Sequence, residues 1–220
     1  MSQPVHQEIK TYPPLEEKIN IHSHVVGLVL SVAGLLAMIL RALQNDSWLD
    51  VVAVTVFGLS MMMLYASSAL YHSATEPAVR IRRRVYDHAS IYALIAGTYT
   101  PLALIALNAS VGWPLFFVAW GVALSGIVLK IFFTGRFDRL STTMYVAMGW
   151  MVLFVLDDFV AALSKQGMTW LAAGGVAYTV GAVAYSIKRI PFHHAIFHLF
   201  VLLGSLCHFI CVYSYVLTGN

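Results

Sequence analysis

The sequence predicts an all-α polytopic membrane protein with seven transmembrane helices. Of its 220 residues, 60% are hydrophobic and only 10% are charged, whereas soluble domains are about 45–50% apolar and about 25% charged. The mean hydropathy of +0.78 agrees with this excess. Seven apolar runs approach the length of about 20 residues that a helix needs to cross a bilayer. Much of the apolar surface must therefore face lipid.

The seven runs are separated by short polar segments. They cover residues 25–40, 51–71, 89–107, 111–129, 140–163, 166–187 and 195–217. The first run is short, so we expect its helix to begin near Asn20. Pro101 should kink the third helix, and Asp157 and Asp158 interrupt the fifth run. Small residues such as Gly174 within the runs are typical of closely packed membrane helices.

A polar segment precedes the first run. Residues 1–18 are predicted to form a cytoplasmic tail, and residues 19–220 a single transmembrane domain. The start of the chain contains Glu8 and Pro13-Pro14, which is not the pattern of a cleavable signal peptide. The first span is therefore expected to remain as an anchor.

Basic residues are distributed unevenly between the two sides. One side carries Lys10, Lys18, Arg80, Arg82, Arg83, Arg84, Lys130, Arg136, Arg139, Lys188 and Arg189. The other side has only Arg41 and Lys165. Because basic loops stay in the cytoplasm, we expect the N-terminus inside and the C-terminus outside. The net charge of +3 is too weak and too scattered to indicate nucleic-acid binding.

Polar residues collect at the predicted cytoplasmic ends of four spans. His72 ends the second span, Asp87 begins the third, and His194 begins the seventh. Asn20 and His24 begin the first. Ionisable groups are costly in a membrane and usually serve a function there. Their common depth therefore predicts one functional site.

The histidines of this layer have the pattern of a metal site. His194 and His198 are four residues apart and so share a helix face, and His72 adds a third nitrogen. Three histidines with an open fourth position are typical of catalytic Zn²⁺. Ser68 lies one turn before His72. Asp87 could hold or deprotonate a water, or could orient a ligating histidine.

Each of these residues also has a simpler interpretation. A lone pair of histidines at this spacing occurs by chance, and Ser68 could be a packing serine. Asn20 could cap the first helix, and His24 could be a satisfied interior histidine. His208 lies about 21 Å deeper than His194 at 1.5 Å per residue, so it should not reach the same ion.

Several motifs resemble the hemolysin III family, the bacterial branch of the progestin and adipoQ receptor family. These are Glu17-x-x-Asn20-x-x-x-His24, Ser68-x-x-x-His72 with Asp87, and His194-x-x-x-His198. The stretches at residues 96–101 and 188–191 are also similar to the bacterial branch. The resemblance covers residues 17–215.

The resemblance implies a seven-helix fold with the N-terminus inside, in the inner (plasma) membrane of a bacterium. It also implies zinc bound by His72, His194 and His198, with Asp87 acting through water. The family is similar to alkaline ceramidases, which are metal-dependent amide hydrolases in membranes. That similarity implies membrane lipids as partners and a role in lipid homeostasis, and it names no protein partner.

Three functions remain open at this point. The first is zinc-dependent hydrolysis of a lipid amide or ester. The second is a non-enzymatic receptor or regulator in which zinc joins the second, third and seventh spans. The third is a hemolysin-like protein that permeabilises membranes. A zinc-bound water facing a lipid-accessible cavity would distinguish the first function from the second.

Overall fold

The computed structural model describes residues 11–133 and 138–218, and side chains except those of residues 138 and 139. Within these residues the chain is helical and contains no strand. Lys10, Arg136, Gly219 and Asn220, on which the predicted orientation partly depends, lie outside the described residues.

Eight α-helices and four short helical segments make up the described part of the chain. The α-helices are α1 Pro14–Ala42, α2 Trp48–His72, α3 Pro77–Pro101, α4 Ala109–Phe133, α5 Asp138–Gly149, α6 Leu156–Ala162, α7 Lys165–Ser186 and α8 His193–Cys211. The short segments are η1 Leu43–Asn45, η2 Leu102–Ala106, η3 Trp150–Val155 and η4 Val212–Val216. Seven spans are long and apolar enough to cross a membrane, the fifth being formed by α5, η3 and α6. The predicted fold class is therefore confirmed.

Two helices begin earlier than the hydrophobic runs indicate, each at a proline. Helix α1 begins at Pro14, inside the segment predicted as a tail, and α3 begins at Pro77. Proline fits the first helical turn because the N–H that it lacks would have no helical partner there. Arg80, which the sequence placed in a loop, therefore lies on α3. Asn20 lies within α1, so the idea that it caps this helix is wrong.

The predicted interruptions of the third and fifth spans take a different form. Pro101 is the last α-helical residue of α3, and the chain continues as a π-helical turn, η2. In the fifth span the helix narrows to the 3₁₀ form at Trp150–Val155, before Asp157. Asp157 lies in the first turn of α6. The α-helix is therefore interrupted deeper in the span than Asp157 and Asp158.

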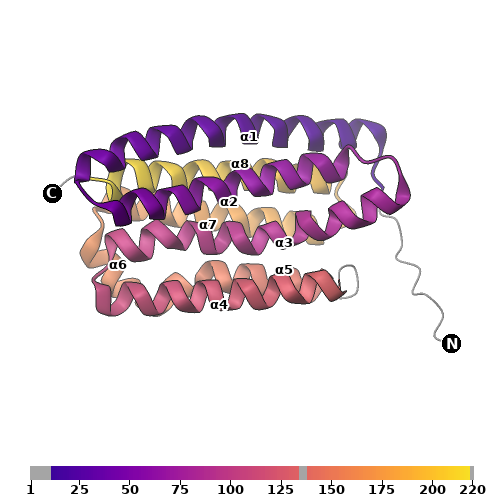
Figure 1. Ribbon diagram of the computed structural model, residues 1–220. Helices are drawn as coiled ribbons and strands as arrows, with labels where there is room; N and C mark the ends of the chain where they lie inside the picture. Colours follow the sequence, from indigo (N-terminus) through magenta and orange to yellow (C-terminus); the bar gives the residue numbers. More distant parts are fainter. Residues whose placement is uncertain (1–10, 134–137, 219–220) are drawn as a thin grey trace.

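The helices form a bundle in which α1, α2 and α3 follow one another as neighbours (Figure 1). Helix α7 packs along α8, and α8 returns against α1. Helix α4 packs on α3, whereas α5 has few contacts with α3 and α7. Gly97 allows α2 and α3 to approach closely, since a Cβ at this position would lie 2.2 Å from Ser60 Oγ.

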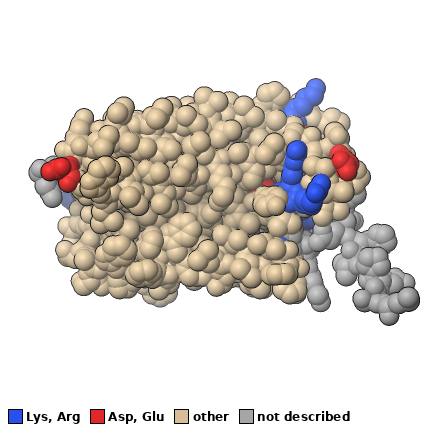
Figure 2. Space-filling model, in the orientation of Figure 1, with Lys and Arg blue, Asp and Glu red and all other residues tan. Residues whose placement is uncertain are grey.

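The surface has the charge distribution of a membrane protein. In Figure 2 the charged side chains lie at the two ends of the molecule and leave an uncharged band between them. Large apolar side chains such as Val29, Phe117 and Phe154 are exposed in the spans, while Phe57 and Tyr65 are buried in the core. Lipid would cover the exposed apolar side chains, so the fold is that of an integral membrane protein.

Candidate metal centre

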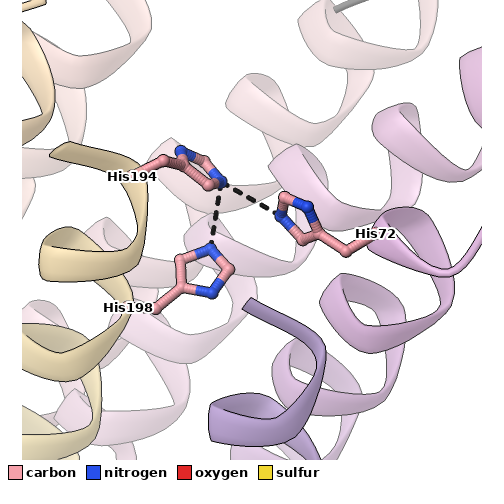
Figure 3. A group of neighbouring side chains, drawn as sticks. All are labelled: His72, His194 and His198. Carbon is pink, nitrogen blue, oxygen red and sulfur yellow. Dashed lines mark hydrogen bonds between the residues drawn. The ribbon is translucent and has the colours of Figure 1, made fainter. Parts of the chain in front are cut away.

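Three histidine side chains meet at the end of the bundle where α1, α3 and α8 begin. His72 is the last residue of α2, and His194 and His198 lie in the first turns of α8. The Nε2 atom of His194 lies 3.0 Å from that of His72 and 3.1 Å from that of His198 (Figure 3). All three side chains are buried.

This arrangement suits a metal ion. One ligand atom from each histidine lies within 4.8 Å of the other two. Tetrahedral zinc with Zn–N bonds of about 2.0–2.1 Å places its nitrogens about 3.3 Å apart, close to the separations observed. Three neighbouring imidazole nitrogens cannot satisfy one another by hydrogen bonds alone, because each ring in its neutral form carries one proton. A cation would accept all three lone pairs.

Glu17 fixes the orientation of His72. Its Oε2 atom lies 2.6 Å from His72 Nδ1, so the Nδ1–H can donate to the carboxylate while Nε2 faces the other histidines. This carboxylate–histidine pairing is the usual support of a ligating histidine. Asn20 also approaches His72 Nδ1, at 3.4 Å, and its backbone carbonyl faces the His198 ring. Glu17 and Asn20, from the first sequence motif, therefore both contact the histidine cluster.

Two further residues, Arg80 and Glu16, hold the site together, and neither was predicted from the sequence. Arg80 is buried and donates from Nη2 to Glu17 Oε1. Its Nη1 donates to the carbonyl of His72, the last residue of α2, at 3.4 Å and to that of Ala74, just after the helix, at 3.1 Å. In the sequence, Arg80 looks like one of several basic residues in a loop. Only its tertiary contacts distinguish it from the neighbouring arginines.

Glu16 supports the opposite side of the site. Its Oε1 atom accepts hydrogen bonds from the backbone N–H groups of His194, at 3.1 Å, and Ala195, at 3.4 Å. Helix α8 has no side-chain cap of its own, so a carboxylate from α1 satisfies its first donors and the positive end of its dipole. Two consecutive acidic residues thus hold the two helices that carry the histidines.

Asp87 and Ser68 lie beside the histidines without joining them. Both are buried, and the Asp87 carboxylate is next to Ser68 and within electrostatic reach of His72. Asp87 is not part of the group whose atoms all lie within 4.8 Å. The Ser68 hydroxyl makes no hydrogen bond of good geometry with a described residue. Both line the same cavity as His194 and His198.

His24 packs face to face on His198. The ring centroids are 3.7 Å apart and the planes differ by 15°. Neither ring nitrogen of His24 has a hydrogen-bond partner among the described residues, so it is not the satisfied interior histidine of the simpler interpretation. His193 is the first residue of α8, and neither it nor His208 belongs to the metal group.

Aromatic side chains pack around the histidines. Tyr12, just before α1, stacks on His194 with centroids 4.4 Å apart and a 19° angle between the planes. Tyr71 contacts His72, and Tyr185 contacts His194. Burial, reinforced by the neighbouring Tyr185, raises the pKa of the Tyr12 hydroxyl, which therefore stays protonated at neutral pH.

On its other side the site opens into a cavity inside the bundle. The cavity has a volume of about 200 Å³ and is lined by His24, Ser68, Asp87, His194 and His198 at one end. Most of its remaining wall is apolar and comes from α3, from the fifth span and from α7 and α8. The loosely packed fifth span forms one of its sides. A metal ion held here would face a space suited to an apolar chain.

Comparison with known proteins agrees with these motifs. The family model described as "Haemolysin-III related" matches residues 13–209. The chain is similar to "Hemolysin-3 homolog" of Bacillus subtilis (strain 168), with 45% identity over 91% of this chain and 94% of the relative. It is also similar to "Hemolysin-3" of Bacillus cereus, with 44% identity over 92% of each chain.

A more distant relative comes from animals. "Monocyte to macrophage differentiation factor" of Homo sapiens is 26% identical over 91% of this chain and 84% of the relative. The family model spans all three histidines and both acidic residues that support them. The seven apolar spans, the buried histidines and these matches together show that the chain belongs to the haemolysin III family of integral membrane proteins.

Proposed function

We propose that this protein is a zinc-dependent hydrolase of a lipid amide or ester in the bacterial inner membrane, with a role in membrane lipid homeostasis. The observation that carries the proposal is the shared cavity. His194, His198, Asp87 and Ser68 line one end of a space whose remaining walls are mostly apolar. Zinc serving only as a clasp between helices would need no such space.

The histidine set fits zinc in ligand type. His72, His194 and His198 would hold the ion, and zinc bound by three histidines supplies Lewis acidity and makes water a better nucleophile at neutral pH. Glu17 orients His72, and Glu16 positions the helix that carries the other two ligands.

The chain's own polar groups would move the protons. Asp87 would accept a proton from the attacking water and pass it to the leaving nitrogen or oxygen as the bond to the acyl carbon breaks. Ser68, which lies beside Asp87 and lines the cavity, would hydrogen-bond the water or the substrate's polar group. The apolar wall would hold the acyl chain and exclude bulk water.

Metal content tests the first part of the proposal. We expect about one zinc per chain in detergent-purified protein, measured by elemental analysis. His72→Ala, His194→Ala and His198→Ala should each lose it. His22→Ala is the matched control, because His22 is exposed on α1. Retention of zinc after changing both His194 and His198 would contradict the site.

Asp87→Asn tests the chemistry. The three histidines remain, so the variant should keep most of its zinc. Its amide cannot accept a proton at neutral pH, so hydrolysis should fall by about 10²-fold or more, the contribution of a general base. The lipid composition of cells carrying wild-type or variant protein, with zinc content and melting temperature, gives the measurement.

The opposite result would favour a structural metal. If Asp87→Asn loses zinc and melts at a lower temperature while the lipid profile stays the same, the carboxylate belongs to a closed site. The protein would then be a regulator in which zinc joins the helices, and the hydrolase proposal would be wrong.

A further inference from the structure

A second polar position lines the same cavity, far from the metal centre. His208 on α8 is ten residues after His198, so it lies about 15 Å further along the helix at 1.5 Å per residue. The side chain lines the cavity and is 6% exposed. Its Nδ1 atom has no hydrogen-bond partner among the described residues.

The described residues around His208 make room for its ring, and none of them forms a hydrogen bond with Nδ1. Gly174 on α7 lets the ring lie against the helix, since a Cβ there would be 2.6 Å from His208 Nε2. The Tyr178 ring lies 5.4 Å away, but its hydroxyl is paired with Ser205 Oγ at 2.9 Å. Much of the nearby cavity wall is apolar, including Leu171 and Val201.

We propose that His208 binds a hydroxyl group in the middle of the substrate's acyl chain. This inference rests on the proposed lipid hydrolase and narrows its substrate class to amides or esters of hydroxylated fatty acids. A plain alkyl chain would pass the imidazole and leave its nitrogen unpaired at a cost in binding. A hydroxyl both donates and accepts, so it can pair with either neutral tautomer of the ring.

The distance along the cavity sets the position of the hydroxyl. With the carbonyl at the metal centre, a group about 15 Å away lies near the middle of a long acyl chain. Ricinoleoyl and oleoyl chains are a matched pair of probes, because they differ by one hydroxyl in that region. Their amides should therefore report on His208 with little change in apolar burial.

The experiment compares hydrolysis of the two amides by purified protein. We expect kcat/KM to be about fivefold higher for the ricinoleoyl amide, the effect of one net hydrogen bond. His208→Leu should bring this ratio to about one, and His208→Gln, which retains hydrogen-bonding groups, should keep part of it. Leu206→Ala is the control, because Leu206 lies on the same helix and is 51% exposed to lipid.

Binding of the free acids separates this inference from the hydrolase proposal. Ricinoleate should displace a bound fluorescent fatty acid about fivefold more effectively than oleate, and His208→Leu should abolish the difference. Equal hydrolysis of both amides by the wild type would overturn the subsite and leave the hydrolase in place. If neither amide is cleaved but ricinoleate binds more tightly through His208, the reaction is wrong and the subsite holds. Equal binding with no cleavage would overturn both.

Discussion

At the scale of single residues, the candidate metal centre depends on acidic side chains that are not among its three histidines. Glu17 joins His72 to Arg80, and Glu16 satisfies the first N–H groups of α8. The two residues are consecutive on α1, so one turn of that helix supports ligands from two others. Such supporting carboxylates fix the ring that binds the metal and raise its basicity.

Glu17→Gln is therefore expected to weaken metal binding. The amide can still accept a hydrogen bond from His72, but the charge that pairs with Arg80 is lost. We expect metal affinity to fall by about 10–100-fold, measured by competition with a chelator. Glu76→Gln is the control, because Glu76 is exposed just before α3. Unchanged affinity in Glu17→Gln would show that its contact with His72 does not support the metal.

At the scale of elements, the Tyr99 hydroxyl binds the backbone of the fifth span where its α-helix is interrupted. Tyr99 on α3 donates from its hydroxyl to the carbonyl of Gly149 at 2.8 Å and accepts from the N–H of Val152 at 2.9 Å. The 3₁₀ segment η3 lies between α5 and α6, and within a membrane no water would satisfy these backbone groups. Trp150 adds a bond to Thr179 on α7.

Removing that hydroxyl should loosen the fifth span. In Tyr99→Phe the ring remains and two backbone groups lose their partner, at a cost of about 1–2 kcal/mol. The expected result is a lower melting temperature in detergent, together with faster hydrogen exchange in residues 149–155. Tyr86→Phe, at a site where the side chain is 67% exposed, should change neither quantity. Equal stability of Tyr99→Phe and the wild type would mean that η3 does not depend on this contact.

At the scale of the whole molecule, the orientation in the membrane remains a prediction. The basic residues favour a cytoplasmic N-terminus, and the metal centre lies at the end of the bundle where α1 begins. If the orientation holds, the metal centre lies at the cytoplasmic end.

Fusions at the C-terminus test the orientation. A phosphatase that folds only outside the cytoplasm should be active when joined after the last residue, and a fluorescent protein exported unfolded should be dark. The same pair joined before the first residue should behave in the opposite way and serves as the control. An active phosphatase at the N-terminus and a bright fluorescent protein at the C-terminus would reverse the orientation and place the metal centre outside.

The sequence by itself determined the number of spans and the depth of the histidines. Both follow from local features, namely the length of each apolar run and the spacing of His194 and His198 on one helix face. Loop lengths then place His72 and Asp87 at the same end of the bundle. Helix starts were less well predicted, because hydropathy does not detect an amphipathic first turn after a proline, as at Pro14 and Pro77.

Only the tertiary structure decided which neighbours support the site. Arg80 and its neighbouring arginines are alike in sequence, and Glu16 is distinguished only by the start of α8 lying against it. The apolar cavity, the packing of His208 against Gly174 and the contact of Tyr99 with the backbone of the fifth span each involve at least two helices. Their positions follow from how the helices pack, which no local pattern of residues specifies.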